Sequence, residues 1–391
     1  MKKFISLMLF FCFVSMFILQ GILTIPCFAL TEEFKDFTAK SFVLMDYNSG
    51  EILVEKNISE KLPVASIVKL MTIELVCEEI ERGAISLDEI VIASENASGM
   101  GGSQVFIEAG GEYSVSDLLK SVIVSSANDA SVALAEKIAG SENSFVNLMN
   151  KKAKELGMKN TNYCNATGLP MSGQFSNALD TAIILKQVTS HEIYHKYSTI
   201  WMDNLLHPKG RESELVNTNK LIRYYEGCDG GKTGSTNEAG YCLSATAKRG
   251  NMRLIAVVLG STTGKDRFDE TAQLFNYGFG NFETKKIVSS EIVLNEKGNV
   301  KGGNVENINV YAKNDLFVLM RKRDEDVNIS TEIRFNEIYA PIKKGDKVGE
   351  IYVIKNGVVV ATSDLISNEN VENQTYYNLI EKIVKNWKVI N

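Results

Sequence analysis

The order in which hydrophobic periodicities follow one another along the chain constrains its fold most strongly. Residues 41–57 and 241–261 each consist of two apolar runs around a turn, at 48–50 and 248–251, which predicts two β-hairpins. The segment between them carries apolar residues at every third or fourth position, the period of a helix. Strands before and after a block of helices are typical of an α+β domain. We therefore expect helices packed on an antiparallel sheet.

Three stretches of the central block predict helices. Residues 64–80 have the pattern of a buried helix, and residues 115–140 predict two helices that are separated around 125–129. Residues 144–158 predict an amphipathic helix that stops near Gly157, because glycine favours helix ends.

The pattern changes after residue 282, where helical periods give way to short alternating runs. Asn356 and Gly357 stand between two of these runs, which is a strong signal for a two-residue hairpin. We therefore expect a first domain over residues 34–282 and a small all-β domain over residues 285–366.

The last residues, 373–391, turn helical and amphipathic. Their apolar stripe consists of Tyr376, Ile380, Ile383, Trp387 and Ile390, and their basic residues are Lys382, Lys385 and Lys388. A helix with these two sides is suited to lie on an anionic membrane surface. The alternative is a helix that packs on the all-β domain.

The N-terminus resembles an export signal. Lys2 and Lys3 precede a long apolar run that ends at Cys27-Phe28-Ala29, with small residues where a signal peptidase requires them. We expect residues 1–29 to be removed and the protein to work outside the cytoplasm, on the outer face of the bacterial cytoplasmic membrane. The alternative is a retained anchor, since the run is long enough to span a bilayer.

Charge and cysteine content exclude other classes of protein. The formal net charge of −6 gives no support for a nucleic-acid partner. Four cysteines follow the predicted signal, and their spacing is not that of a metal site. An exported protein can form disulfides, but we expect Cys77 and Cys242 to be small core residues. The four are Cys77, Cys164, Cys228 and Cys242.

Ser66 and Lys69 are suited to act as a nucleophile and its base. They stand three positions apart at the start of a predicted helix, so they share a face and the amine can reach the hydroxyl. A serine hydroxyl needs such a base to attack near neutral pH. A free lysine titrates near ~10.4, so Lys69 can serve only if burial and a second cation, such as Lys232, lower its pKa.

Ser126 and Asn128 stand at the predicted break between two helices. The Ser126 hydroxyl is suited to relay a proton between Lys69, Lys232 and a leaving amine. The Asn128 amide is suited to hold a peptide carbonyl of the substrate together with the side chain of Lys69.

A third motif, Lys232-Thr233-Gly234, stands just before a predicted strand. Its ammonium and hydroxyl groups are suited to bind a carboxylate, and Gly234 leaves room for a substrate against the strand. We expect the backbone N–H groups of Ser66 and Ser235 to bind the oxyanion of an acyl-transfer reaction.

The three motifs together, in this order, resemble those of the penicillin-recognising serine enzymes. The chain resembles a serine-type D-alanyl-D-alanine carboxypeptidase, a low-molecular-mass penicillin-binding protein, over about residues 34–282. It departs from the family pattern at Ala127, where many members have Gly, and at Ser235, where some have His. The resemblance is carried by SFVLMDYNSGEILVEKN, LPVASIVKLMT, SSANDA, NATGL, LVNTNKLI and GCDGGKTGSTNEAGYC.

The resemblance implies a β-lactamase/transpeptidase-like catalytic domain, followed by an all-β domain and a membrane-associated helix. It implies that Ser66 attacks the bond between the last two D-Ala residues of a peptidoglycan stem peptide and forms an acyl-enzyme that water then releases. Lys232 would hold the terminal carboxylate, and β-lactams would acylate Ser66. Neither a metal nor another cofactor is required.

Several alternatives stay open at this point. A D,D-transpeptidase or endopeptidase would use the same residues. A catalytically silent cell-wall or penicillin-binding module would be expected to lack Ser66 or Lys69, and both are present. A class A β-lactamase would carry an E-x-x-L-N stretch between the second and third motifs, which this chain lacks.

Residues 191–195 read HEIYH, which matches the H-E-x-x-H pattern of zinc proteases. Glu212 and Glu214 lie at a workable distance for a third ligand. The preceding Thr189-Ser190 reads as a helix boundary, and a zinc protease would place this motif inside a long buried helix. We therefore expect a surface helix without chemistry.

Overall fold

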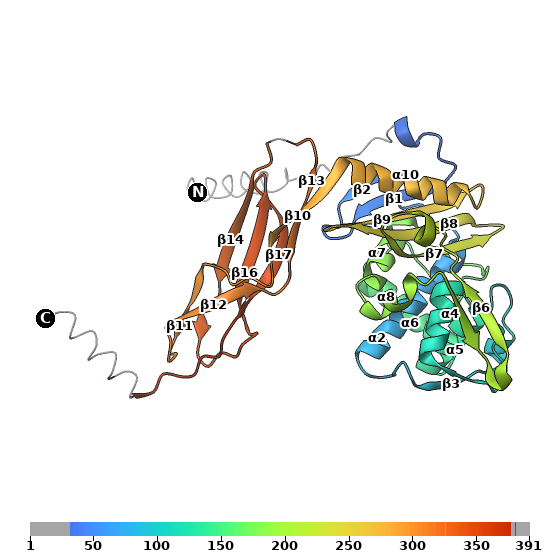
Figure 1. Ribbon diagram of the computed structural model, residues 1–391, viewed down its shortest axis with the longest axis horizontal. Helices are drawn as coiled ribbons and strands as arrows, with labels where there is room; N and C mark the ends of the chain where they lie inside the picture. Colours follow the sequence, from blue (N-terminus) through green and yellow to red (C-terminus); the bar gives the residue numbers. More distant parts are fainter. Residues whose placement is uncertain (1–31, 325, 377–379, 381–391) are drawn as a thin grey trace, which may run out of the picture. The chain divides into compact units, whose positions relative to one another are not determined.

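The computed structural model describes residues 32–324, 326–376 and 380 (Figure 1). The predicted export signal over residues 1–29 and most of the predicted terminal helix lie outside the described residues. Residues 32–36 belong to a unit of their own, and they contain the 3-10 turn η1 (Glu32–Phe34). Within the described parts of the chain, every helix is too short or too polar to cross a membrane.

The first domain is built on one antiparallel sheet of five strands, in the order β2-β1-β9-β8-β7. Both predicted hairpins are confirmed, since β1 pairs with β2 and β8 pairs with β9. β9 lies at the centre of the sheet and is buried along most of its length, whereas β7 is an edge strand. The strands are β1 (Ser41–Asp46), β2 (Ile52–Lys56), β7 (Cys228–Thr236), β8 (Gly240–Arg249) and β9 (Met252–Ser261).

Helices cover both faces of this sheet (Figure 1). α10 (Asp266–Asn281) packs on β8 and β9 from one side, and a Cβ atom at Gly278 would come within 2.5 Å of the end of the Leu254 side chain, so glycine lets the helix lie close to the sheet. The other helices lie on the opposite face, where α7 (Ala178–Val188) contacts β1 and β9. The predicted arrangement of helices on an antiparallel sheet is confirmed.

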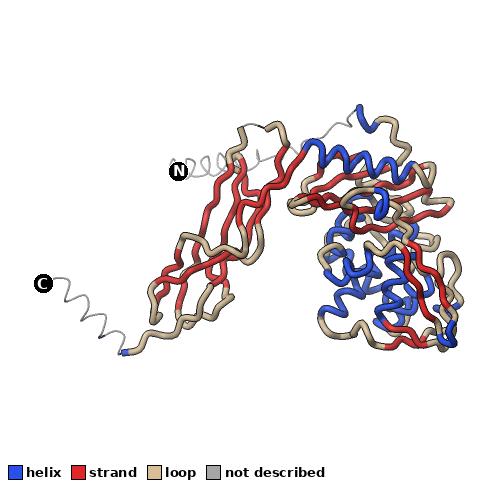
Figure 2. Tube along the Cα trace, viewed as in Figure 1, coloured by secondary structure: helices blue, strands red, loops and turns tan. Residues whose placement is uncertain are grey.

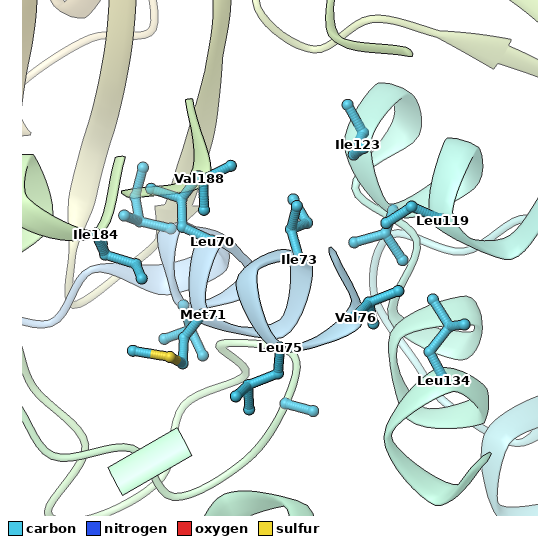
Figure 3. Packing of buried hydrophobic residues seen from close by; sticks show 14 of the residues in the cluster. Leu70, Met71, Ile73, Leu75, Val76, Leu119, Ile123, Leu134, Ile184 and Val188 are labelled. Carbon is cyan, nitrogen blue, oxygen red and sulfur yellow. The ribbon is translucent and has the colours of Figure 1, made fainter. Parts of the chain in front are cut away.

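α2 (Lys69–Glu81) is the central helix of this opposite layer, and a 3-10 turn, η2 (Ala65–Val68), leads into it. Figure 3 shows Leu70, Ile73 and Val76 of α2 among the side chains of neighbouring helices. All three are buried, so the start of α2 is held by the core on several sides. The surrounding helices are α4 (Val115–Ser125), α5 (Asn128–Ala139), α6 (Glu142–Glu155), α7 and α8 (Glu192–Ser198).

The remaining elements of the domain are short, and the periodicity of the sequence did not predict them. β3 (Ile90–Ile92) pairs with β4 (Glu112–Ser114), and β5 (Met202–Leu206) pairs with β6 (Glu212–Val216). α3 (Glu95–Ser98), η3 (Pro208–Gly210) and α9 (Leu221–Tyr224) are each about one turn long.

The described residues from 282 to 375 form strands and loops, as Figure 2 shows. The Asn356-Gly357 hairpin is confirmed: both residues have positive φ, of 50° and 82°, as a turn of this kind requires. One two-stranded sheet pairs β10 with β13, and a six-stranded sheet has the order β14-β16-β17-β12-β11-β15. The strands are β10 (Phe282–Val288), β11 (Lys297–Lys301), β12 (Asn307–Ala312), β13 (Leu316–Arg321), β14 (Ile329–Phe335), β15 (Ile338–Tyr339), β16 (Lys347–Lys355) and β17 (Val358–Ser367).

Candidate active site

Ser66 and Lys69 lie one turn apart at the junction of η2 and α2. Lys69 Nζ and Ser66 Oγ are hydrogen-bonded over 3.1 Å. Ala65, directly before Ser66, has a φ of 48°, a conformation that L-residues other than Gly adopt at a cost. Lys69 is fully buried, whereas Ser66 is half-buried. The hydroxyl is therefore reachable from outside while the amine beneath it is shielded from water.

A tight turn at residues 165–168 supports Lys69 from the other side. The Asn165 carboxamide oxygen accepts bonds from the backbone N–H groups of Thr167 and Gly168. This turn aims the Thr167 carbonyl at Lys69, which donates to it over 2.5 Å. A Cβ atom at Gly168 would lie 2.1 Å from the carbonyl oxygen of Ala65, so glycine is required here. The prediction that the Asn128 amide holds the Lys69 side chain is wrong: the Thr167 carbonyl makes that contact, and the Asn128 amide nitrogen donates to Gly101.

Ser126 and Lys232 form the second half of the cluster. Ser126 ends α4 with a φ of 62°, and this left-handed conformation separates α4 from α5 as predicted. The Lys232 ammonium donates to Ser126 Oγ over 2.7 Å and to the Thr233 carbonyl oxygen over 3.2 Å. Both side chains are buried, so a proton can pass between them out of contact with bulk water.

The charges in the cluster favour a neutral Lys69. Burial, and after it the positive charge of Lys232, hold the pKa of Lys69 well below its usual range, although Asp129 opposes this shift. Burial and the guanidinium of Arg267 lower the pKa of Lys232 to about 7. The lowered pKa of Lys69 therefore favours a neutral amine beside Ser66, as a base requires.

Asn128 begins α5 and faces the glycine-rich loop over residues 98–103. Its amide nitrogen donates to the Gly101 carbonyl, and its backbone N–H donates to the Ser103 carbonyl. A Cβ atom at Gly102 would lie 2.8 Å from the Asn128 amide nitrogen. Asn128 Oδ1 is buried and has no protein partner among the described residues, so its capacity to accept a hydrogen bond is unused there.

The third motif lies inside β7, a strand that the sequence did not predict, and it precedes the predicted strand β8. Lys232, Thr233 and Gly234 are all in β7, paired with Ser244, Leu243 and Cys242 of β8. A Cβ atom at Gly234 would lie 2.5 Å from the Val64 carbonyl oxygen and 3.1 Å from the Ser66 nitrogen. The missing side chain thus lets β7 approach η2, the turn that contains Ser66 and is called the nucleophile turn below. Ser235, the next residue, also lies in β7.

Arg267 of α10 is a further charged residue at this site that sequence reasoning missed. Its guanidinium donates to the Gly234 carbonyl over 3.1 Å and to the Cys242 carbonyl over 3.4 Å. It also lies over the rings of Tyr241 and Phe268. It therefore joins α10 to β7 and β8 and adds positive charge near Thr233. No short motif surrounds it in the sequence, so only the packing of α10 on the sheet brings it here.

The HEIYH segment forms the start of α8, and its two histidines have different partners. His191 is buried and contacts Glu81 through Nδ1 (2.7 Å) and Glu74 through Nε2 (3.0 Å), whereas His195 Nε2 contacts the Thr189 carbonyl. Burial alone would lower the pKa of His191, but the contacts with Glu74 and Glu81 raise it to about 9. The expected surface helix is therefore wrong in part, because this helix is half-buried and joined to α2.

The four cysteines that follow the predicted signal are all free thiols. Cys77 in α2 and Cys242 in β8 are buried, as predicted. Burial raises the pKa of Cys228 to about 12 and that of Cys242 to about 11, which keeps both thiols protonated.

Comparisons with known proteins agree with this geometry. Residues 29–263 match the family model described as D-alanyl-D-alanine carboxypeptidase, and residues 282–373 match the C-terminal domain of penicillin-binding protein 5. The chain is 40% identical to D-alanyl-D-alanine carboxypeptidase DacF of Bacillus subtilis, over 89% of this chain and 90% of that protein.

Solved structures show the same fold. Penicillin-binding protein 5 from Haemophilus influenzae is 34% identical, with a TM-score of 0.69 over 86% of this chain and 98% of that one. Penicillin-binding protein D2 from Listeria monocytogenes, solved in its ampicillin-bound form, is 31% identical, with a TM-score of 0.56 over 63% of this chain and 99% of that one. A family match over more than half of the chain, together with a 40% identical relative of nearly equal extent, identifies the chain as a member of the D-alanyl-D-alanine carboxypeptidase family of serine peptidases.

Proposed function

We propose that the protein removes the terminal D-Ala from peptidoglycan stem peptides through an acyl-enzyme on Ser66. The observation that carries this proposal is the contact between Ser66 and the buried, neutral-favoured amine of Lys69. This pair supplies a nucleophile and a base without a metal or another cofactor.

In the first half of the reaction, Lys69 takes the Ser66 proton while Oγ attacks the carbonyl carbon between the last two D-Ala residues. The backbone N–H groups of Ser66 and Ser235 stabilise the resulting oxyanion. Ser126, bonded to Lys232, passes its proton to the departing amine and regains one from Lys232, which the proton taken up by Lys69 then restores. The C–N bond breaks, D-Ala leaves with a neutral amine, and the shortened stem remains as an ester on Ser66.

Substrate binding involves the other predicted residues. Lys232 and Thr233 hold the terminal carboxylate. Arg267 adds a positive charge nearby, which favours binding of the same carboxylate. Asn128 meets the amide backbone of the stem, and Gly234 leaves room for the stem along β7. In the second half of the reaction, water attacks the ester, and the proton returns to Ser66. A β-lactam would acylate the same oxygen, in keeping with the ampicillin-bound relative.

The proposal predicts that the purified protein releases D-Ala from a D-Ala-D-Ala peptide and that excess EDTA leaves the rate unchanged. The measurement is a coupled D-Ala assay, with product masses recorded with and without a D-amino acid acceptor. Loss of activity in EDTA with recovery on adding zinc would contradict the serine mechanism. Products joined to the acceptor in preference to free acid would favour the transpeptidase alternative.

We further propose that the protein is exported and bound peripherally to the outer face of the cytoplasmic membrane through residues 373–391. The support is the sequence pattern alone: one apolar stripe and three lysines on a terminal helix.

Deletion of residues 373–391 is therefore expected to move the protein from the membrane fraction to the soluble fraction. The reason is that an interfacial helix binds by its buried apolar area and its attraction to anionic lipid. Fractionation of cells, followed by fluorescent-penicillin labelling of each fraction, measures the shift. A second variant replaces Lys382, Lys385 and Lys388 by Gln. It removes the attraction to anionic lipid and keeps the apolar stripe, so it should weaken membrane binding only partly and most visibly at low salt. A truncated protein that stays in the membrane fraction would contradict the proposal.

A further inference from the structure

The helix that contains HEIYH joins the two elements on which the proposed chemistry depends. α8 contacts α2, which follows Ser66 and carries Lys69, and β7, which carries Lys232. Its N-terminal end is tied to α2 by the two contacts of His191 with Glu74 and Glu81. The proposed mechanism assigns no role to the rest of the helix.

The other side of α8 is tied to β7 just before Lys232. The Gly231 N–H donates to the hydroxyl oxygen of Tyr194 over 2.7 Å, and Ser198 Oγ donates to the Asp229 carbonyl over 2.6 Å. Tyr194 is among the largest fully buried side chains of the protein. Its hydroxyl is therefore held in place by close packing as well as by this bond.

Two glycines of β7 have no side chain where one would block this contact. A Cβ atom at Gly230 would lie 2.7 Å from the Tyr194 hydroxyl oxygen, and one at Gly231 would lie 2.4 Å from the Ser244 carbonyl oxygen. Gly231 also has a φ of 137°. Side chains at these positions would push β7 away from α8 or from β8, so the strand can occupy this place only with glycine at both.

The edge of β7 that Tyr194 binds is also the edge that faces the reaction. β7 ends the sheet, and its pairing with β8 is regular from Gly230 to Thr236. Since strand residues alternate, the N–H groups of Gly231 and Ser235 point toward the same outer edge. One of these groups is bound by Tyr194, and the other is the proposed oxyanion donor. Lys232 lies between them.

We propose that Tyr194 is a positioning residue for the acylation step. By holding the Gly231 N–H, it sets the distance of β7 from the nucleophile turn and thereby places the Lys232 ammonium beside Ser126 and the Ser235 N–H beside the oxyanion. The inference rests on the proposed function, because it uses the roles of Lys232 and Ser235.

The experiment compares Tyr194→Phe with Tyr197→Phe. Tyr197 is a matched control, because it is a buried tyrosine of the same helix whose hydroxyl bonds Ser116 of α4 in place of β7. The measurements are the second-order rate of acylation by a fluorescent penicillin, the pH profile of kcat/KM for D-Ala release, and the melting temperature. A wild-type protein that is not acylated at all would contradict the proposed function, whereas the comparison of variants tests Tyr194.

We expect Tyr194→Phe to slow acylation about tenfold, since it leaves a buried N–H without its acceptor and frees the strand to shift. A looser β7 admits water to Lys232, whose pKa burial lowers, so the alkaline limb of the profile moves to higher pH. Tyr197→Phe should lower the melting temperature by a similar amount and leave the acylation rate and the limb unchanged. Wild-type acylation in Tyr194→Phe, or equal slowing in both variants, would overturn the proposal.

A second variant keeps the test decisive where Tyr194→Phe folds poorly. Gly230→Ala retains the hydroxyl but displaces it, so it should slow acylation in the same way. In the double variant the two losses should not add, because both act through one contact. Additive losses would show that Gly230 and Tyr194 act separately and would overturn the assignment.

Discussion

Ser66→Ala is expected to lower the rate of D-Ala release by a factor on the order of 10⁴ to 10⁶ and to abolish covalent labelling by penicillin. The variant loses Ser66 Oγ, which is bonded to the buried Lys69 and belongs to a side chain that is only half-buried. Without it, neither the peptide nor a β-lactam can be held as an ester. A coupled D-Ala assay and gel fluorescence measure the two losses.

The matched control for this variant is Ser190→Ala. Ser190 is an exposed serine at the end of α7, and its hydroxyl donates only to the Gln187 carbonyl among the contacts of the described residues. It should retain wild-type kinetics, and both variants should melt close to the wild-type temperature, since each removes one oxygen. Labelling of Ser66→Ala at the wild-type level would show that another residue is the nucleophile.

Lys69→Arg is expected to lower the acylation rate by a factor of roughly 10² to 10⁴. A guanidinium keeps its proton at any accessible pH, so the variant retains a cation but loses the base. Burial and the charge of Lys232, which lower the pKa of Lys69, also make a permanent cation costly at this position. Lys61→Arg is the matched control, because Lys61 is exposed and lies over the ring of Phe175.

The pH dependence of the wild-type enzyme tests the same assignment. Acylation needs neutral Lys69, so kcat/KM should fall as acid protonates it. Because the pKa of Lys69 is held well below its usual range, this limb should lie far below the ~10.4 of a free lysine. Above about pH 7 the rate should fall again as Lys232 loses the charge that binds the carboxylate. A rate that rises steadily up to the range of a free lysine would contradict the role of Lys69.

Local signals predicted many of the larger elements. The two hairpins of the sheet, the helix that follows Ser66 and the break at Ser126 in the first domain, and the Asn356-Gly357 turn in the second, carry turn residues or a helical repeat. α7, α10 and β7 were not predicted. The short β3–β4 and β5–β6 hairpins have too few residues to show a period. β7 was not predicted because CDGGKTGST is rich in glycine, which disfavours strands unless tertiary contacts require them.

The candidate site was predictable where several residue types recur at short spacing. Ser66, Lys69, Ser126 and Lys232 belong to such motifs. The fold forms two hydrogen-bonded pairs from them, Ser66–Lys69 and Ser126–Lys232, close enough for the charge of Lys232 to act on Lys69. Thr167 contributes only a backbone carbonyl, which any residue could supply, so no side-chain pattern marks it.

HEIYH shows how a short pattern can mislead when it is taken alone. Its letters match a metal motif, yet His191 binds two glutamates of α2 and His195 binds a backbone carbonyl. The residue of this segment that contacts β7 beside Lys232 is Tyr194, which stands at a position that the zinc pattern leaves unspecified. Which side of a helix faces a strand edge depends on long-range packing, and no five-residue pattern contains that information.

Mass spectrometry of the protein after brief incubation with penicillin in EDTA tests the central claim, a covalent serine mechanism, most directly. We expect one adduct per chain with the full mass of the β-lactam, located in the peptide that contains Ser66, and its absence in Ser66→Ala. An unmodified protein that still hydrolyses the D-Ala-D-Ala peptide, or an adduct that maps to any other residue, would contradict the mechanism.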